Sequence, residues 1–500
     1  MVAGPQSAGS GALTAGVDVG TTSVKVVVAD GTGRVVARAR RPSGLVVGPG
    51  RFEHDAVATW WEAPRQALAA VLGPLQGGPV GEGRLSAVAV SAMMPSVAAV
   101  DASGRPLGPG LLYGDPRGAA AGGEAAPEGP TASQEMARLT GWVAEQRPEA
   151  AGYWPAQAVA NASLGVPGVV DLASAFASGS LFDGSSWAGA ACGAAGVATG
   201  QMPRVAVFGE AVGHLAPELW PGPGEAPVLA AGSVDGFCEQ LVSGAVEDGD
   251  LLVVLGSTLV VWLCTPGWPS AAPGLWRVPH LVGGKALVGG ASNAGGLWVD
   301  WADRLLRPAG PAGEAGEQGG GVEGSNWPST TGPDGLRPAG VPVWWPWAKG
   351  ERVPWHDPSL RASMSGADLS LGPGALRRAA LEATGFVVRH IAQLASASGT
   401  GVRRCLVSGG GTANRAWLQA LADVLGAPVL PAASPEGAAL GAAYLARLSV
   451  GLEGSLDDAS RWARWLAPVE PRADWADAAE ERYLSWLAGL PAVPGRVVTP

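Results

Sequence analysis

The stretch that decides the fold of this chain is GVDVGTTSVK, residues 16–25. Residues 17–19 predict a short β-strand, and the turn-forming residues 20–23 interrupt it. β-Branched residues resume at 24–29 and predict a second strand, and residues 35–37 predict a third. Two consecutive hairpins are an unusual opening for a domain. The polar first turn places backbone amides next to threonine and serine hydroxyls, an arrangement that can bind anions.

The composition indicates a folded protein of two or three domains. The chain has 500 residues, of which 47% are hydrophobic and 15% are charged, and this excludes disorder throughout. The formal net charge is −10, so the chain as a whole lacks the basic surface of a nucleic-acid-binding protein. We therefore expect no nucleic-acid partner.

Cysteines and apolar runs bear on where the protein works. The four cysteines are far apart and lack the spacing of metal ligands, which favours reduced, inert thiols. The longest apolar run, residues 251–264, is too short to cross a bilayer core of about 30 Å as a helix. Residues 1–16 lack the positive charge and the apolar run of a signal peptide. We expect a cytoplasmic protein with no membrane segment.

Strands and helices alternate along the rest of the chain, which predicts an α/β fold. The predicted helices are 56–72, 376–394 and 413–425, and the predicted strands include 85–90, 97–100, 228–231, 251–255 and 405–407. Residues 256–258 interrupt the apolar run 251–264 and favour two strands joined by a tight turn. Residues 118–130 and 308–340 are rich in glycine, alanine and proline and predict surface loops.

Three turns share backbone amides without large side chains, next to hydroxyls, at the carboxyl end of an apolar strand. They are residues 20–23, 256–258 and 409–412. Such turns can hold phosphate oxygens through their N–H groups. In a chain with 77 glycines, each turn by itself is more often an ordinary loop. The sequence contains no Walker A motif, no protein-kinase motif set and no dinucleotide-binding fingerprint.

Two aspartates stand beside these turns. Asp18 ends the first predicted strand, two residues before Gly20, and Asp235 lies within the glycine-flanked turn 232–236. A carboxylate at a strand end can hold Mg²⁺ through water opposite a bound phosphate. A carboxylate beside a hydroxyl can accept its proton during phosphoryl transfer. The alternative for each aspartate is a cap on its own turn.

Seven segments occur in a characteristic order between residue 16 and about residue 447. They are GVDVGTTSVK at 16–25, RFEHD at 51–55 with the tryptophans at 60 and 61, YGDPR at 113–117, the Asp235 turn with 251–258, WAKGERVP at 347–354, SGGG at 408–411, and EGAALGAA at 436–443. Together they resemble the FGGY carbohydrate kinase family, which belongs to the actin-like ATPase superfamily. The joint match is far more specific than any single turn.

The resemblance implies an α/β fold of two actin-like (ribonuclease H-like) domains flanking a central cleft. It implies an N-terminal sugar-binding domain at 12–241, a C-terminal nucleotide-binding domain at 242–447 and a helical extension at 448–500. It also implies ATP and Mg²⁺ as cofactors and a small sugar or polyol as the partner. A homodimer is compatible with it.

The resemblance also implies roles for residues at the matching positions. Asp18 would bind Mg²⁺ through water, and Asp235 would be the general base and would contact the substrate. Met94 and Asp115 would face the sugar. Phosphate and nucleotide contacts would come from Thr21, Thr22, Ser23, Gly256, Ser257, Thr258, Gly409, Gly410 and Asn414.

The segment Met93-Met94-Pro95 departs from the family pattern. Xylulokinases carry Gln-Met-His-Gly here and glycerol kinases carry Gln-Arg-Glu-Thr, whose side chains reach sugar hydroxyls. Met94 matches the xylulokinase methionine, whereas Pro95 can donate no hydrogen bond, and glycerol is therefore disfavoured. The alternative for the two methionines is core packing.

The leading hypothesis is the ATP-dependent phosphorylation of a small sugar or polyol, most like a ketopentose such as xylulose. Two other hypotheses stay open. One is a non-catalytic sugar- or nucleotide-binding relative with a regulatory role, motivated by the altered segment. The other is an actin-like ATPase with a protein client.

Overall fold

The computed structural model describes residues 11–77, 84–118, 133–220, 224–281, 283–306 and 336–491. These residues form two compact units. The first unit contains the described residues up to Gly244 together with Glu436–Ala463. The second contains the described residues of Ala245–Pro435 and those from Arg464 onward. The chain therefore leaves the first unit once, returns to it late, and leaves it again.

The two compact units do not test the predicted domain boundaries, and two predicted loops lie largely outside the described residues. The domain boundaries at 241/242 and 447/448 stay a prediction, because the units group residues by packing rather than by order along the chain. The predicted loop at 118–130 lies outside the described residues from residue 119 onward. The predicted loop at 308–340 lies outside them up to residue 335.

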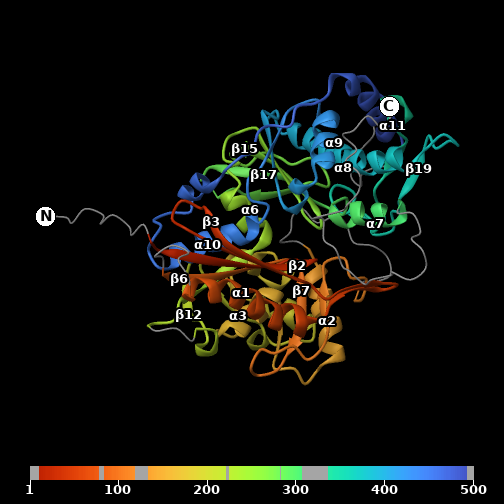
Figure 1. Ribbon diagram of the computed structural model, residues 1–500. Helices are drawn as coiled ribbons and strands as arrows, with labels where there is room; N and C mark the ends of the chain where they lie inside the picture. The colour runs from red at the N-terminus through yellow and green to blue at the C-terminus, as the bar shows by residue number, and fades with distance from the viewer. Residues whose placement is uncertain are drawn as a thin grey trace, which may run out of the picture. The chain divides into compact units, whose positions relative to one another are not determined.

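The first unit is built on a six-stranded sheet (Figure 1). In spatial order its strands are β12 (Ala211–His214), β13 (Val228–Val234), β6 (Leu85–Ala92), β1 (Leu13–Val19), β2 (Ser23–Ala29) and β3 (Val35–Pro42). β1, β2 and β3 pair antiparallel, which confirms the two predicted hairpins. β1, β6 and β13 run parallel, so their carboxyl ends lie at one edge of the sheet.

Helices cover both faces of this sheet, which explains why every residue of β1 is buried. Figure 1 shows α10 (Gly437–Ser449) and α6 (Asp235–Val242) on one side of the sheet, and α1 (Ala63–Gly77) and α3 (Ala156–Leu164) on the other. A strand buried on both faces needs a continuous apolar run rather than an alternating one. The valines of β1 and β2 supply that run.

α10 approaches β1 and α6 at positions where only glycine fits. A Cβ atom at Gly16 of β1 would lie 1.8 Å from the carbonyl oxygen of Ala439 on α10. A Cβ atom at Gly441 of α10 would lie 2.0 Å from the carbonyl oxygen of Cys238 on α6. Both distances are far shorter than a van der Waals contact, so the absence of a side chain allows backbone to pack on backbone.

A second sheet of the first unit begins where β6 ends. Its five strands, in spatial order, are β4 (Leu45–Gly48), β5 (Arg51–His54), β8 (Gly110–Leu112), β7 (Ser96–Val100) and β9 (Gly152–Trp154). β7 follows β6 after a short turn, and it pairs antiparallel with β8 and β9. This sheet carries segment 51–55 and leads into segment 113–117, two of the segments on which the resemblance rests.

The second unit is also built on a six-stranded sheet. Its strands, in spatial order, are β16 (Trp276–Pro279), β17 (Lys285–Ser292), β15 (Leu259–Pro266), β14 (Asp250–Leu255), β20 (Arg404–Ser408) and β21 (Val429–Pro431). β14 and β15 form an antiparallel hairpin, which confirms the predicted strand, turn and strand over 251–264. The predicted helices at 376–394 and 413–425 are confirmed as α8 (Pro373–Ser396) and α9 (Arg415–Leu425).

The two sheets share one topology. In the first, the antiparallel run β3-β2-β1 continues into parallel β6 and β13. In the second, the antiparallel run β17-β15-β14 continues into parallel β20 and β21. This repetition confirms the predicted α/β fold of two ribonuclease H-like domains. Within the described ranges, no helix has the length and apolar character needed to cross a membrane.

The predicted C-terminal extension divides between the two units. Trp462 ends the short helix η8 (Asp457–Trp462) and is 1% exposed in the first unit. Trp475 belongs to the second unit, where the guanidinium carbons of Arg378 and Arg472 each lie 4.2 Å from its ring centroid. The cation–π contact between Arg378 and Trp475 joins the segment around residue 475 to α8.

Gly441→Ala should destabilise the protein, because its added Cβ would collide with the backbone of α6. Overpacking of this kind costs about 1–3 kcal/mol. Gly73→Ala is the matched control: Gly73 also lies within a helix, but no atom of the described residues lies within 4 Å of its Cβ position. Alanine there should stabilise by up to about 1 kcal/mol through helix propensity. Thermal unfolding followed by circular dichroism measures both, and a Gly441→Ala variant as stable as the control would contradict the close packing.

Candidate functional site

Three parallel strands of the first unit end at the same sheet edge and bring the two predicted acids to it. Asp18 of β1 pairs with Ser91 of β6, and Ser91 pairs with Ser233 of β13. Asp235 follows two residues later as the first residue of α6. Burial is the main cause of the raised pKa of the Cys238 thiol on α6; the charge of Asp171 adds to it, and the charges of Asp18 and Asp235 contribute less. Asp18 and Asp235 therefore both act on this buried thiol.

Asp18 is placed where a cation would be favourable. It is 8% exposed, and its Oδ1 accepts no hydrogen bond from any described residue. Burial raises the pKa of Asp18 to about 6, although the charge of Lys25, its partner across the hairpin, lowers it. A buried carboxylate oxygen without a donor is costly unless a cation compensates it. Oxygen donors of this type are the ligands that Mg²⁺ prefers, so the residue fits the predicted metal role.

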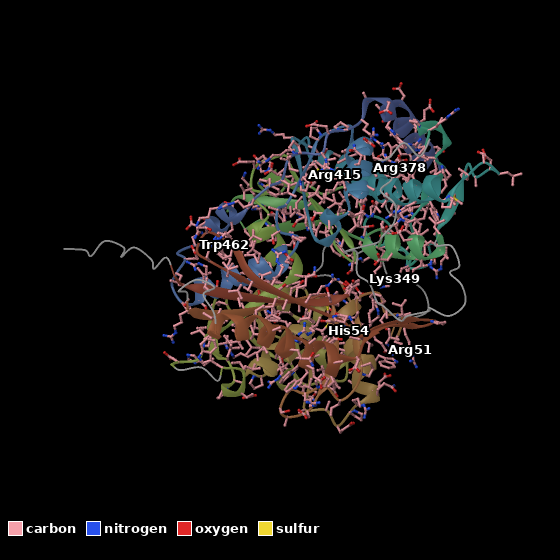
Figure 2. The ribbon with its side chains drawn as sticks, in the orientation of Figure 1. Arg51, His54, Lys349, Arg378, Arg415 and Trp462 are labelled. Atoms are coloured by element: carbon pink, nitrogen blue, oxygen red, sulfur yellow. The ribbon has the colours of Figure 1, made fainter. Side chains whose placement is uncertain are left out.

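Side chains from two other segments hold the turn at residues 20–23. The Thr21 hydroxyl lies 2.8 Å from the Tyr113 hydroxyl, and the Thr21 carbonyl accepts a 2.7 Å hydrogen bond from Nε2 of His54. Figure 2 labels His54. Trp60 donates to Nδ1 of His54 at 2.9 Å, which places the proton of the neutral ring on Nε2. Burial lowers the pKa of His54 to about 4, against the opposing effect of its bond to Thr21. The ring is therefore neutral at physiological pH.

The other predicted residues of this turn are Thr22 and Ser23. The backbone N–H of Ser43 donates to the Thr22 carbonyl at 3.1 Å, and Ser23 is 2% exposed. Sequence reasoning assigned no functional role to His54 or Tyr113. Both residues lie in segments that carry the family resemblance, 51–55 and 113–117. That position is the feature of the sequence that could have pointed to them.

Asp115 is part of an ion-pair network. Arg117 donates to its Oδ1 at 2.8 Å and to its Oδ2 at 2.7 Å, and Arg117 also binds Glu53. The backbone N–H groups of Phe52 and Arg117 donate to the same carboxylate at 2.7 and 3.0 Å. The hydrogen bond to Asp115 is the main cause of the raised pKa of Arg117. Four donors occupy the acceptor positions of Asp115, and its predicted contact with the sugar stays a prediction.

The two methionines after β6 differ in exposure. Met93 is 2% exposed, which confirms core packing for that residue. Met94 is partly buried and packs against a cluster that includes Val97 and Leu111. The Ser96 hydroxyl lies 3.8 Å from the sulfur of Met94. Contact between Met94 and a substrate stays a prediction.

In the second unit, parallel strands bring the remaining predicted residues to one sheet edge. Val254 of β14 pairs with Ser408 of β20. The turns at 256–258 and 409–411 therefore begin side by side, since the carboxyl ends of parallel neighbours meet. The edge presents two glycine-containing turns next to each other. That these turns bind phosphate stays a prediction.

Local contacts shape these two turns. The Gly256 N–H donates to the Thr258 carbonyl at 3.1 Å, and the Leu297 N–H donates to the Ser257 carbonyl at 3.0 Å. Leu297 lies in the first turn of α7 (Gly296–Leu306). Gly409 has a φ of +88°, and a Cβ there would lie 2.8 Å from a backbone oxygen of β14. A glycine is therefore required where the second turn leaves β20.

Gly410 and Asn414 bracket the start of α9. Gly410 begins a 3₁₀ turn, η7 (Gly410–Ala413), and Asn414 is the N-cap of α9. The side-chain oxygen of Asn414 accepts the Trp417 N–H at 3.1 Å. The structure thus places Asn414 beside the glycine turn with one side-chain atom used for capping, and its contact with a nucleotide stays a prediction.

Glu351 is a buried carboxylate to which sequence reasoning gave no role. It accepts hydrogen bonds from the Ser292 hydroxyl at 2.8 Å and from the N–H groups of Asn293 and Arg352 at 2.8 and 2.7 Å. Burial raises the pKa of Glu351 to about 7 despite these bonds. Glu351 joins segment 347–354 to the end of β17. The feature of the sequence that could have pointed to it is its position within a segment that carries the family resemblance.

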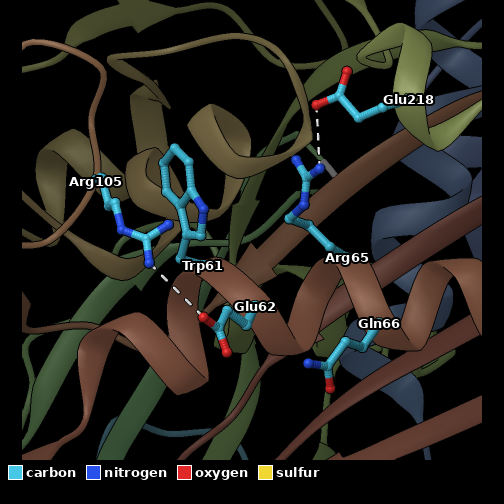
Figure 3. A pocket seen from close by; sticks show the side chains of 6 residues that line it. All are labelled: Trp61, Glu62, Arg65, Gln66, Arg105 and Glu218. Carbon is cyan, nitrogen blue, oxygen red and sulfur yellow. Dashed lines mark hydrogen bonds and ion pairs between the residues drawn. The ribbon is translucent and has the colours of Figure 1, made fainter.

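A separate hollow of about 410 Å³ lies on the first unit (Figure 3). It is lined by Trp61, Glu62, Arg65, Gln66, Arg105 and Glu218. Arg65 pairs with Glu218 at 3.1 Å and Arg105 pairs with Glu62 at 3.8 Å. None of the predicted site residues lines this hollow, and its arginines are already paired.

Comparison with known proteins identifies the family. Residues 13–143 match the N-terminal domain of the FGGY family of carbohydrate kinases, and residues 251–450 match its C-terminal domain. The chain belongs to the FGGY family of carbohydrate kinases. The predicted kinase class is therefore confirmed, and family membership implies ATP as the phosphoryl donor.

Individual relatives of this FGGY kinase differ in the sugar that their names give. Xylulose kinase from Bacillus subtilis (strain 168) is 25% identical over 489 residues, which cover 92% of each chain. Gluconokinase from the same strain is 25% identical over 474 residues, which cover 89% of each. The crystal structure of xylulose kinase from Rhodospirillum rubrum has a TM-score of 0.68 at 26% identity, covering 95% of this chain and 98% of that chain. The carbohydrate kinase class is common to all three.

Asp18→Asn should stabilise the kinase at neutral and alkaline pH in the absence of divalent cations. The carboxyl has a pKa of 3.8 when unfolded and about 6 when folded, so the folded state binds more protons between these values. Stability should fall as the pH rises from about 4 to about 6, and the full cost above that range is about 3 kcal/mol. Asparagine removes that cost, so the Tm of the variant should exceed that of the wild type at pH 8 and match it below about pH 4.

Asp30→Asn is the control of opposite sign for this measurement. Hydrogen bonds from Thr32 and Arg34 outweigh partial burial and lower the pKa of Asp30, so its charge stabilises the folded state. Thermal unfolding in EDTA across the pH range distinguishes the two variants. A stabilising effect of Asp18→Asn that does not change with pH would rule out the proposed origin.

Arg117→Leu should destabilise the kinase by about 3 kcal/mol, because it leaves the carboxylates of Glu53 and Asp115 buried without their cation. Arg105→Leu is the matched control, since both members of the Arg105–Glu62 pair are about half exposed and the pair is 3.8 Å apart. Its loss should cost less than about 1 kcal/mol. Urea denaturation measures both free energies, and equal losses would show that the network is not an important contributor.

Proposed function

We propose that this FGGY kinase transfers the γ-phosphoryl group of ATP to a hydroxyl of a small sugar or polyol, most like a ketopentose such as xylulose. The observation that carries the proposal is the presence of Asp18 and Asp235 at one sheet edge, where three parallel strands end. One carboxylate is buried with an oxygen that accepts no hydrogen bond from any described residue. The other begins a helix and is only partly buried.

Asp235 acts as the general base in this proposal. Its carboxylate accepts the proton of the attacking hydroxyl as the hydroxyl oxygen forms a bond to the γ-phosphorus. The bond from the γ-phosphorus to the bridging oxygen breaks, and ADP leaves with that oxygen. Oδ1 of Asp235 accepts the Gly236 N–H at 2.7 Å, a bond that restricts the orientation of the carboxylate.

Asp18 would hold Mg²⁺ through water. When bound, the metal ion neutralises charge that develops on the phosphate oxygens. The oxygen of Asp18 that lacks a donor among the described residues supports this assignment. Thr21, Thr22 and Ser23 would contact phosphate oxygens from the turn that follows β1.

The turns of the second unit would bind the nucleotide. Gly256, Ser257 and Thr258 would contact phosphate, and Gly409, Gly410 and Asn414 would lie against the rest of the nucleotide. Their common sheet edge and the left-handed conformation of Gly409 support this assignment. Backbone amides at such turns bind phosphate without requiring a basic side chain.

The substrate assignment rests on weaker specificity determinants. Met94 would contact the sugar, and Pro95 supplies no donor, so discrimination at the hydroxyl that it faces should be poor. Asp115 would face the sugar. Since four donors already occupy its acceptor positions, its main contribution would be to hold Arg117 and, through Arg117, Glu53 in place beside the sugar. The Bacillus subtilis xylulose kinase and gluconokinase support a panel of ketoses and sugar acids.

The test is ADP release from Mg-ATP with a panel of ketoses, aldoses, polyols and sugar acids. One sugar should raise ADP release, and Asp235→Asn should lower kcat for that sugar by about 10²–10⁴-fold, the usual contribution of a positioned base. Asp183→Asn is the matched control, since it removes the same charge from an exposed turn. It should leave kcat unchanged.

Two outcomes would contradict the proposal. Sugar-dependent thermal stabilisation without turnover by the wild type would favour the alternative of a non-catalytic binding protein, which the altered segment 93–95 motivates. Unchanged turnover by Asp235→Asn would show that another group takes the proton. ATP binding by the Asp235→Asn variant, measured by calorimetry, should be retained in either case.

A further inference from the structure

Strand β13 is irregular immediately before it reaches Asp235. Residues Val228–Ala230 pair in register with Ala87–Ala89 of β6, and pairing resumes at Ser233 opposite Ser91. Two residues, Ala231 and Gly232, therefore oppose one residue of β6, which is a β-bulge. Gly232 has a φ of +76°, and a Cβ there would lie 1.9 Å from a backbone oxygen of β6. The bulge changes the direction of the strand, and so it changes the position of the residues that follow, Asp235 among them.

Buried amides of α3 hydrogen-bond to the backbone at this bulge. Gln157 donates through Nε2 to the carbonyl of Ala231 at 2.8 Å and to that of Val90 at 3.4 Å. Asn161 donates through Nδ2 to the carbonyl of Ala231 at 3.2 Å. Both side chains belong to residues that are 0% exposed and stand one helical turn apart. A bulge that interrupts ladder bonding needs such donors, because unpaired buried carbonyls are costly.

Asp171 holds the strand on the other side of the bulge. The Ser233 hydroxyl donates to Oδ2 of Asp171 at 2.6 Å, and both residues are 0% exposed. The same carboxylate accepts the N–H groups of Ala173 and Ser174 at 3.0 and 3.1 Å and so caps α4 (Leu172–Phe176). Burial raises the pKa of Asp171, and these hydrogen bonds oppose that effect. The carboxylate thus links β10 (Val169–Asp171) and α4 to the end of β13.

We propose that Asp171 and Ser233 are positioning residues for Asp235: their hydrogen bond holds the end of β13 so that Asp235 leaves the sheet edge in a fixed place. The inference rests on the proposed role of Asp235 as the base. Ser233 is two residues from Asp235, and no larger element intervenes between them. A shift of about 1 Å in a reacting group can cost about 10²-fold in rate, so loss of this hydrogen bond should be visible in kcat.

Ser233→Ala should lower kcat by about 10²-fold, measured with the sugar that the wild type phosphorylates, and should leave the KM for Mg-ATP nearly unchanged. Asp171→Ala should have a similar effect. Asp171→Asn should restore most of the activity, because asparagine keeps a polar partner for the Ser233 hydroxyl and is itself a good N-cap.

Ser178→Ala is the matched control for a merely structural role. Ser178 is 1% exposed and donates to the Ser174 carbonyl at 3.0 Å, so the variant loses a buried hydroxyl hydrogen bond near α4 without touching β13. Its kcat should equal that of the wild type. In an Asp235→Asn background, Ser233→Ala should cause no further loss, since a residue that acts through the base has no effect once the base is gone.

Hydrogen exchange supplies a readout that does not depend on turnover. Amides of residues 234–237 should exchange faster in Ser233→Ala than in the wild type, and at the wild-type rate in Ser178→Ala. Unchanged exchange, a wild-type kcat in Ser233→Ala, or multiplicative losses in the double variant would each overturn the inference. A wild type that turns over no sugar would instead count against the proposed function, and the exchange experiment would still decide the role of Ser233.

Discussion

The close approach of α10 to β1 and α6 is the constraint on which the first unit depends. Gly16 and Gly441 carry no side chain, so α10 packs directly on the backbone of both elements. β1 contains Asp18, and α6 begins with Asp235. One helix, α10, therefore packs on both elements that carry the acids, and it comes from the part of the chain that follows the main body of the second unit. The packing around this sheet edge therefore joins residues near the start of the described chain to a helix more than 400 residues later.

Buried carboxylates of the first unit differ in how their charge is compensated. Asp171 accepts three hydrogen bonds and Asp115 accepts four, so groups of the chain itself compensate both charges. Asp18 has an oxygen that no described residue serves. Since a buried charge is costly without a partner, this difference separates carboxylates that organise the fold from one suited to an external cation. The uncompensated charge of Asp18 reduces the stability of the fold at the position where the proposed chemistry needs a ligand for a metal ion.

Much of the fold and part of the candidate site could be predicted from the sequence. The hairpins at β1–β2–β3 and β14–β15 follow from β-branched runs and turn formers, which act over a few residues. Asp18 stood out because it ends an apolar strand next to a polar turn. His54 did not, because its role depends on bonds to Thr21 and Trp60 that arise only when separate segments meet. Networks between distant segments leave no periodic signal in the sequence.

The alternation of strands and helices, the glycine turns at the strand ends and the resemblance to the kinase family could all be read from the amino-acid sequence. These properties depend on backbone preferences and apolar patterning that operate within about a dozen residues. Three further properties became visible only in the folded chain: Glu436–Ala463 packs with the first unit, Met93 lies in the core, and the Ser233 hydroxyl donates to Asp171. Burial and hydrogen-bond partners come from elements far apart in the chain, so they exist only once those elements have packed together.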